Sequence, residues 1–281
     1  MTNTAGRTFG VEIETVGLSE ITALVAIESV VSARRAHYSS RDYSAWSVKG
    51  DGSLESPNGE AAEIVSPVME WGNADHYAQV ERVTRALREA GARVNETCGL
   101  HVHIGASDLS RTELMGVVKA YTAAQDSLNH NISPYRLDSS WAKIWPSWEG
   151  PQTTIRYGDP TWESLRDAFI GGDYMDRYMT VNLAPYADRG TVEFRQHNGS
   201  LNARTILAWA GLCVSTVKLG SEVEHREQWA YKTEAGSDWT GVYDFLRKYD
   251  SLDTHAEQFA SLLTPATGLS GVMAAAGVGN A

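Results

Sequence analysis

The sequence lacks the features that define several special classes of protein. Its 281 residues contain only two cysteines, Cys98 and Cys213, and no Cys-x-x-Cys pair. This excludes a disulfide framework and a zinc knuckle, and it fits a reducing compartment. No apolar run approaches about 18 residues, and the first residues lack a basic-then-apolar signal. We therefore expect a cytoplasmic protein without a membrane-spanning segment.

Basic residues are also in deficit. The chain has 24 Lys and Arg against 35 Asp and Glu, a formal net charge of -11. A surface that binds nucleic acid is normally basic, so we expect no direct nucleic-acid contact. Small anionic ligands stay compatible with this charge, because bound metal ions can reverse the local field. The sequence also has no Walker A motif and no Gly-x-Gly-x-x-Gly motif, so any nucleotide must be held in another way.

What is present is the composition of an ordinary globular domain. Apolar residues make up 42% of the chain and charged residues 21%, and the length allows a sizeable core. We predict one catalytic-type domain over residues 1–265. Its irregular, Trp-rich stretch at 131–160 is interpreted as a substrate-side lid or insertion, because long loops inside compact domains are usually functional. Residues 266–281, rich in Gly and Ala, are predicted to form a flexible tail.

Hydrophobic periodicity predicts an α+β fold, with an antiparallel sheet backed by helices. Alternating patterns predict strands at 7–16, 46–49, 60–68, 98–105, 178–183 and 190–197. Helical spacing and capping residues predict helices at about 19–36, 73–90, 110–129, 160–169, 202–219, 239–249 and 253–263.

The stretch 98–105, Cys-Gly-Leu-His-Val-His-Ile-Gly, carries two histidines at i and i+2. In a strand, His101 and His103 point to one face and the aliphatic residues between them to the other. Imidazole binds a metal or a phosphate, depending on its protonation. Taken alone, this pattern also fits two half-exposed histidines on a sheet surface.

Two other strands repeat the pattern of paired polar residues. Glu12 and Glu14 share a face of strand 7–16, Glu193 and Arg195 share a face of strand 190–197, and Glu63 lies in the apolar strand 60–68. Glutamate is uncommon in strands. Exposed strand faces and a surface ion pair are the alternative interpretation. If these charges are buried together, Mg²⁺ or Mn²⁺ with an anionic ligand would offset a cost of several kcal/mol each.

Five segments, in this order, resemble the amidoligase family of carboxylate–amine ligases, which is related to glutamine synthetase and γ-glutamylcysteine ligase. The resemblance covers about residues 7–220. It implies a curved, glutamine-synthetase-like antiparallel catalytic sheet, two or three divalent ions, ATP and an acyl-phosphate intermediate. The segments are Gly10-Val-Glu-Ile-Glu14, Asp51-Gly-Ser-Leu54, Glu63-Ile-Val-Ser-Pro67, Cys98-Gly-Leu-His-Val-His103 and Gly190-Thr-Val-Glu-Phe-Arg-Gln-His-Asn-Gly-Ser-Leu-Asn202.

The resemblance implies a metal role for five residues. Glu12, His101 and Glu193 would bind the ion that bridges the β- and γ-phosphates of ATP. Glu14 and Glu63 would bind an ion nearer the substrate carboxylate.

The resemblance implies catalytic or binding roles for further residues. His103 would touch phosphate, and Arg195 would stabilise the transferred γ-phosphoryl group. Asp51 would orient the attacking amine or accept its proton, although Asp-Gly is also a common turn. Four other residues suit nucleotide or substrate contacts or, equally, solvated loop positions: Arg189, Asn182, Arg136 and Lys143.

The sequence therefore predicts a ligase that uses ATP and Mg²⁺ (or Mn²⁺) to join a carboxylate to an amine, both being small molecules or peptides. One alternative is a metal-dependent guanidino or carboxyl kinase of the same fold. Another is a non-catalytic binding protein that keeps a decayed site.

Overall fold

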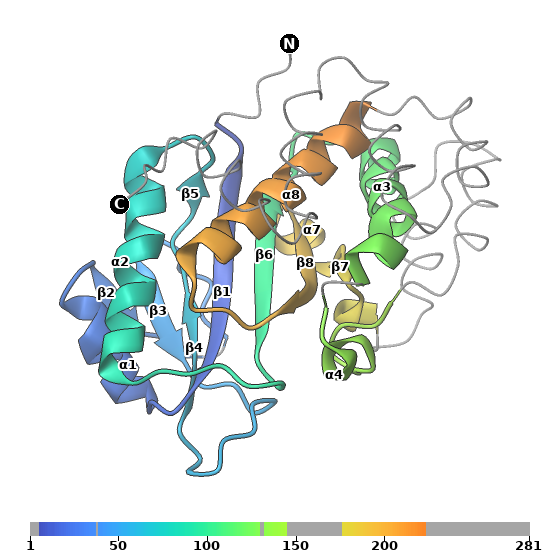
Figure 1. The fold of residues 1–281 in the computed structure, drawn as a ribbon. Coiled ribbons are helices and arrows are strands. Elements are labelled where there is room, and N and C mark those ends of the chain that lie inside the picture. Colours follow the sequence, from blue (N-terminus) through green and yellow to red (C-terminus); the bar gives the residue numbers. More distant parts are fainter. Residues whose placement is uncertain (1–5, 38, 130–131, 145–175, 223–281) are drawn as a thin grey trace.

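The computed structural model describes residues 6–37, 39–129, 132–144 and 176–222. Within them, eight strands form one sheet in the order β2-β3-β4-β1-β6-β8-β7, and β5 pairs with β1 beside this path (Figure 1). The strands are β1 (Thr8–Val16), β2 (Ala33–Arg35), β3 (Trp46–Lys49), β4 (Ala61–Val65), β5 (Met69–Glu70), β6 (Gly99–Gly105), β7 (Val181–Asn182) and β8 (Thr191–Asn198).

Helices join these strands and cover the sheet. They are α1 (Glu20–Glu28), α2 (Ala74–Ala90), α3 (Arg111–Asn129), α4 (Pro134–Leu137), the 3-10 helix η1 (Asp176–Tyr178), α7 (Ala184–Arg189) and α8 (Ala203–Glu222). None of the described helices is long and apolar enough to cross a membrane. The predicted mixed architecture, a sheet backed by helices, is confirmed. The curvature of the sheet and its likeness to glutamine synthetase stay predictions.

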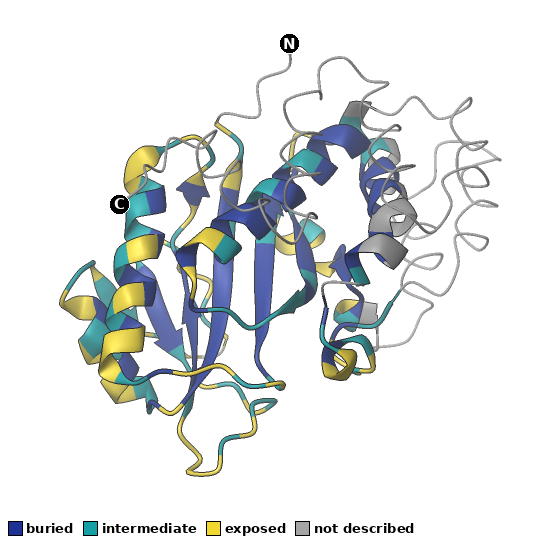
Figure 2. Ribbon diagram, viewed as in Figure 1, coloured by how far each residue is buried: buried dark blue, intermediate teal, exposed yellow. Residues whose placement is uncertain are grey.

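The core lies between the sheet and helices α2 and α8, which cross one of its faces (Figure 1). Phe9, Val11 and Ile13 of β1 point into it and are at most 2% exposed. Figure 2 shows the consequence: the strands and the inner sides of the helices are buried, while the outer side of α2 is exposed. We call this the helix face of the sheet. The opposite face, toward which Glu12 and Glu14 point, is called the polar face.

Local sequence signals explain the ends of several helices. Asn73 caps α2, and its side chain accepts hydrogen bonds from the backbone N–H groups of Asp75 and His76. Gly91 ends the same helix at φ 107°, a left-handed conformation that glycine adopts without strain. At the start of α3, the Ser110 hydroxyl accepts from Glu113 N while the Glu113 carboxylate accepts from Ser110 N. This reciprocal capping fixes where the chain turns away from β6.

Two predicted elements of the N-terminal half need correction. The helix expected over 19–36 ends at Glu28, and 33–35 form β2, the partner of β3 in a parallel pair. β-Branched Val30 and Val31 favour extended structure, and pairing of Ala36 N with Val48 O holds this segment against β3. The strand expected over 60–68 ends at Val65 as β4, because Pro67 cannot donate to a ladder, and the separate strand β5 follows at Met69–Glu70.

The segment from 176 to 189 also differs from expectation. The strand predicted over 178–183 is reduced to η1 and β7, and α7 follows where no helix was predicted. α4 is a helical turn within the predicted irregular stretch 131–160, most of which lies outside the described residues. The predicted helices at 160–169, 239–249 and 253–263 and the tail at 266–281 lie outside them as well.

Candidate active site

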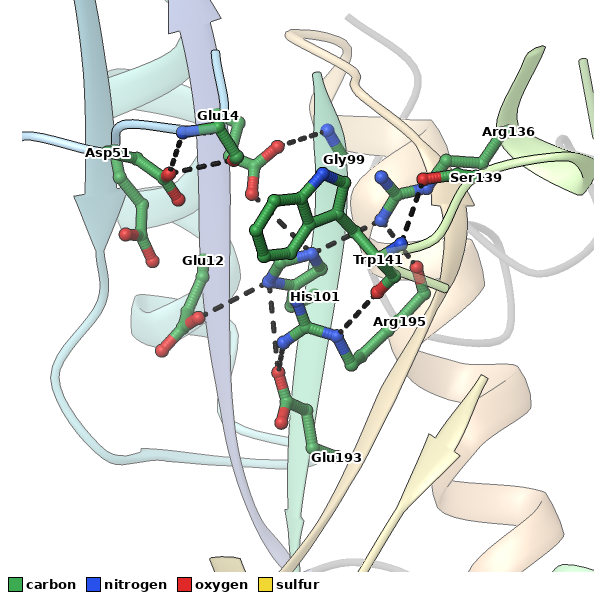
Figure 3. Close-up of polar contacts among 12 residues, drawn as sticks. Glu12, Glu14, Asp51, Gly99, His101, Arg136, Ser139, Trp141, Glu193 and Arg195 are labelled. Carbon is green, nitrogen blue, oxygen red and sulfur yellow. Dashed lines mark hydrogen bonds and ion pairs between the residues drawn. The ribbon is translucent and has the colours of Figure 1, made fainter. Parts of the chain in front are cut away.

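Strand register places the predicted polar residues on one face of the sheet. β4, β1, β6 and β8 are consecutive neighbours, all antiparallel. Directly opposed residues of an antiparallel pair project to the same side. The polar residues are therefore aligned as cross-strand pairs, shown in part in Figure 3: Glu63 with Glu14, Glu12 with His101, and His103 with Glu193.

A β-bulge separates the two polar residues of β8 from the rest of that strand. Leu100 opposes His197, whereas Val102 opposes Phe194. His101 alone therefore lies opposite two residues of β8, Arg195 and Gln196. The bulge keeps Arg195 on the polar face and turns the following side chains toward the helices, as bulges beside functional sites often do.

Glu12, His103 and Glu193 form the group best arranged for a metal ion. One ligand atom from each lies within 4.8 Å of the others. His103 Nε2 is 3.4 Å from Glu12 Oε1 and 3.8 Å from Glu193 Oε1. This nitrogen is buried and has no hydrogen-bond partner within the described residues. A buried imidazole nitrogen without such a partner, facing two carboxylates, fits a divalent cation with mixed oxygen and imidazole ligands.

His101 lies at the centre of the polar face but is turned differently. Its Nδ1 is 3.4 Å from Glu12 Oε2, and its Nε2 accepts a hydrogen bond from Arg136 Nη2 at 3.2 Å (Figure 3). Glu14 Oε1 is 3.5 Å from the same Nε2. The sequence prediction gave the metal role to His101 and the phosphate role to His103. In the structure, His103 belongs to the group whose ligand atoms lie within 4.8 Å of one another, while His101 Nδ1 also faces Glu12 and Glu193, at 3.4 and 3.8 Å. The metal and phosphate roles of the two histidines stay predictions.

Arg195 is held at the edge of the group by contacts on several sides. Its Nη1 donates to Glu193 Oε1, and its Nε donates to the carbonyl of Trp141 at 3.1 Å. The guanidinium carbon lies 5.8 Å from the ring centroid of Tyr178. Trp141 packs edge-on against the same ring, at a centroid distance of 4.8 Å. The described end of the Trp-rich stretch therefore reaches the arginine expected to act in phosphoryl transfer.

Asn182 supports Glu193 in this structure. It lies opposite Glu193 in the β7–β8 pair, and its Nδ2 donates to Glu193 Oε2 at 2.6 Å. Its own Oδ1 accepts from Ala184 N. Sequence reasoning predicted a nucleotide contact for Asn182; the observed contacts orient a carboxylate of the proposed metal group.

Lys49 is a residue of the polar face that sequence reasoning missed. It opposes Glu63 in the β3–β4 pair, and its Nζ is 3.2 Å from Glu63 Oε1. The signal was available: Lys49 ends the strand Trp-Ser-Val-Lys, directly before the Asp-Gly turn that returns the chain to β4. Only the register shows that this turn brings the ammonium group to a buried carboxylate.

The carboxylates of the polar face differ in proton affinity. Burial alone would raise the pKa of Glu12, but the neighbouring imidazoles of His101 and His103 lower it well below its usual range. Burial likewise opposes the charge of Glu193, and Arg195 then lowers its pKa below the usual value. The pKa of Glu63 is raised, first by burial and then by the charge of Glu12, despite the nearby Lys49. Neighbouring carboxylates whose pKa values are driven apart are typical of functional sites.

A pocket adjoins the metal-capable group on the same face. Its lining residues include Glu12 and His103 of that group, together with Val65, Val68 and Arg189. The Arg189 guanidinium lies 5.6 Å from the centroid of the Tyr43 ring, which also lines the pocket. Arg189, predicted to bind a cofactor, is thus placed beside the group that would hold its phosphates.

Two other residues predicted to be functional make local contacts: Asp51 lies in a turn, and Lys143 lies in a bridge between two backbone segments. Asp51 Oδ1 accepts from both the backbone N–H and the hydroxyl of Ser53 at 2.7 Å, which is the ordinary chemistry of a turn. Its proposed contact with an amine stays a prediction. Lys143 joins Met179 through an isolated bridge between their backbones.

Two known proteins are similar to this chain. Glutamate–cysteine ligase from Natronomonas pharaonis is 26% identical over 167 residues, which are 54% of this chain and 44% of that enzyme. The chain thus spans less than half the length of this curated relative. The crystal structure of a bifunctional glutathione synthetase from Pasteurella multocida aligns with a TM-score of 0.40 and 12% identity, over 97% of this chain and 52% of that one.

The family comparison extends over most of the chain. Residues 5–217 match the family model described as "Putative amidoligase enzyme". This range contains all the strands and the whole polar face described above. The chain belongs to the amidoligase family.

Proposed function

We propose that this protein is an ATP-dependent carboxylate–amine ligase that works through an acyl phosphate. The observation that carries the proposal is the buried group formed by Glu12, His103 and Glu193, with Arg195 in contact with it. A carboxylate is a poor electrophile, and transfer of a phosphoryl group makes it a good one. Membership in the amidoligase family supports the same reaction class.

In this proposal, Glu12, His103 and Glu193 hold one Mg²⁺ or Mn²⁺, and Glu14 and Glu63 belong to a second site. These ions would neutralise phosphate charge and orient the transferred group. The donor set fits such ions, since Mg²⁺ and Mn²⁺ prefer carboxylate oxygen and accept imidazole.

The protein's own cations complete the proposed chemistry. Arg195 donates to the γ-phosphoryl group as its charge is redistributed, because its guanidinium offers planar, fixed donors. Glu193 and the Trp141 carbonyl hold that guanidinium in place. The pocket beside Glu12 and His103 receives the nucleoside, with Arg189 and Tyr43 at its wall.

The proposed reaction has two steps. A carboxylate oxygen of the acid attacks the γ-phosphorus, the bond to the β-phosphate oxygen breaks, and ADP leaves. The amine then attacks the acyl carbon, inorganic phosphate leaves, and the amine loses a proton. We assign that proton to Asp51 or water.

A hydroxylamine experiment tests the proposal without knowledge of the natural amine. The full chain is incubated with ATP, Mg²⁺, hydroxylamine and a panel of acids that begins with glutamate, the acid named in its curated relative. We expect ADP and hydroxamate in equal amounts with one of these acids, and none without ATP. Using ¹⁸O-labelled acid, one label should appear in the released phosphate.

The other outcomes separate the alternatives. If, without hydroxylamine, ADP is formed in proportion to a released phosphorylated acid or guanidine and no added amine is converted to an amide, the protein is a kinase. Absence of any Mg-ATP binding by calorimetry would identify a non-catalytic protein. Either result would overturn the ligase proposal.

A further inference from the structure

A segment from one edge of the sheet contacts a helix at the other edge. Residues 39–44 lie between β2 and β3, whereas α7 lies between β7 and β8. Four strands, β4, β1, β6 and β8, separate β3 from β7 (Figure 1). Arg41 Nη2 is nevertheless 3.0 Å from Asp188 Oδ2, and the Arg189 guanidinium carbon lies 5.6 Å from the centroid of the Tyr43 ring. We call residues 39–44 the strap.

The strap and α7 meet at the pocket of the polar face. Tyr43 and Arg189 line this pocket together with Glu12 and His103. The main chain joins the strap to another part of the pocket wall, because Val68 N donates to the carbonyl of Tyr43 at 3.1 Å. The strap is thus attached to the wall through its backbone and to α7 through its side chains.

Local contacts decide which side chains of the strap face α7. Asp42 is turned back toward β2, where its Oδ2 accepts from Arg34 Nη1, and its Oδ1 accepts from Ser44 N at 3.0 Å. Arg41 and Tyr43, the residues before and after it, both contact α7. Side chains that alternate in this way are typical of an extended segment. The sequence Arg-Asp-Tyr therefore places a cation and an aromatic ring on the same side of the strap.

The contact between the strap and α7 is weak enough to open. The side chains of Arg41 and Asp188 are 65% and 52% exposed, so water and salt screen their attraction. Most of the strap is exposed, and Tyr43 is half-buried. Segments that open to admit a ligand belong to such weakly held parts of a fold. The ion pair can break while a ligand enters and form again over it.

The proposed ion divides the pocket lining between two parts of a nucleotide. The phosphates would lie at Glu12 and His103, because these residues belong to the group that would hold the ion. The nucleoside is then left with the remaining lining, where the Tyr43 ring joins Val65 and Val68. An aromatic ring can stack on any base, because every base has a π face.

We propose that the strap binds the nucleoside of ATP: Tyr43 stacks on the base, and Arg41 is a positioning residue whose ion pair with Asp188 holds Tyr43 in place. The identity of the ligand rests on the proposed function. Because the strap contacts the nucleoside, its loss weakens binding of the nucleoside and leaves binding of the phosphates unchanged.

Two ligands separate these contributions in the full chain. One is the non-hydrolysable ATP analogue with a β,γ-imido bridge, and the other is inorganic tripolyphosphate, each with Mg²⁺. Calorimetry measures both dissociation constants. Tyr43→Ala removes the ring, whereas Tyr43→Phe keeps it. Arg41→Gln and Arg41→Asp remove the ion pair, and Arg41→Asp/Asp188→Arg restores it with the charges exchanged.

The matched control is Arg35→Gln. Arg35 lies on β2 close to the strap in sequence, and it forms another exposed ion pair, with Glu20 of α1. This substitution therefore removes a similar interaction that does not reach the pocket. Thermal unfolding of each variant shows whether it is folded.

We expect Tyr43→Ala to weaken binding of the ATP analogue by about 5- to 150-fold and Tyr43→Phe to bind like the wild type. Arg41→Gln should weaken it by about 1.5- to fivefold, as for an exposed ion pair. Arg41→Asp should have a larger effect, which the exchange with Asp188 should largely reverse. No variant should change the affinity for tripolyphosphate, and Arg35→Gln should change neither constant.

Three results would overturn the inference. The first is wild-type affinity of Tyr43→Ala for the ATP analogue. The second is an equal loss for both ligands, which would show a general structural role. The third is a charge exchange that restores nothing. If Tyr43→Ala fails to fold, the Arg41 series decides. Failure of the proposed function has a different signature, because the wild type itself would then bind neither ligand.

Discussion

The two faces of the sheet treat polar groups in opposite ways. On the helix face, neutral polar groups pair with one another: Gln196, for example, accepts from Tyr121 OH and donates to Asn129. On the polar face, buried carboxylates share histidines and cations. Each face also holds a buried nitrogen without a hydrogen-bond partner among the described residues, Trp209 Nε1 on the helix face and His103 Nε2 on the polar face. Groups satisfied one by one make a stable core. Buried charges that are balanced only collectively indicate a face built to bind a ligand.

Neighbouring residues of β8 allow the sharpest test of this difference. Glu193→Gln keeps the shape of the side chain and its hydrogen bond from Asn182, but removes the charge. We expect an intact fold and at least about a thousandfold loss of ATP-dependent product formation, together with loss of Mn²⁺ binding. Glu70→Gln, an exposed glutamate on β5, should be fully active. Normal turnover by Glu193→Gln would contradict the proposed metal role.

Phe194, the next residue of β8, should show the opposite behaviour: its loss should lower stability and leave activity unchanged. Phe194 is fully buried on the helix face, and its ring centroid lies 5.4 Å from that of Tyr121. Phe194→Ala should lower the free energy of unfolding by about 3–5 kcal/mol in urea titrations. Activity per folded molecule should change little. Val68→Ala, at a 57% exposed position, should cost less than about 0.5 kcal/mol. Lost activity with unchanged stability would break the assignment of residues to faces.

Much of this contrast could be predicted from sequence. The period of two in strands 7–16, 98–105 and 190–197 separates polar from aliphatic residues, and the structure shows these strands as neighbours. Periodicity cannot give the order of strands or their register, so the link between Lys49 and Glu63 was missed. The family resemblance supplied roles for the residues, but it carries no information about which nitrogen of a histidine faces which carboxylate.

The alternating sequence pattern also did not predict the bulge in β8. Strict alternation would put His197 on the same face as Glu193 and Arg195. One extra residue opposite His101 instead turns His197 to the helix face, where its ring packs against Trp209. The signal for a bulge is weak, because Arg-Gln-His contains neither Gly nor Pro. Only the strand register shows on which face His197 lies.

Lys49, which lies opposite Glu63 of β4, offers a further test of the difference between the two faces. In EDTA-treated protein, Lys49→Met leaves Glu63 without its cation, so the pKa of Glu63 should rise further. We expect about 2 kcal/mol lower stability at pH 7, less than for a fully buried pair, because the Lys49 side chain is 20% exposed and Glu63 can take up a proton. Urea unfolding and carboxyl NMR measure both effects.

A double substitution provides the control for Lys49. In Lys49→Met/Glu63→Gln neither charge remains, so part of the lost stability should return. If the single and double variants are equally stable, the ion pair contributes nothing to the fold and the polar face is balanced by other groups.

The smallest expected effect concerns His197, on the helix face. Burial against Trp209 lowers its pKa to about 4, below the value of about 6.5 in the unfolded chain. A depressed pKa stabilises the fold above pH 6.5, and this contribution is lost as the pH falls toward 4, since the unfolded state then binds more protons. The ring is partly exposed, so we expect a loss of about 1 kcal/mol between pH 7 and pH 5. His197→Phe should remove this part of the pH dependence in urea titrations, whereas His37→Gln, at an exposed position, should leave it. An identical pH dependence in His197→Phe and the wild type would mean that the ring is hydrated enough to titrate normally, and the bulge would then not have moved it out of water.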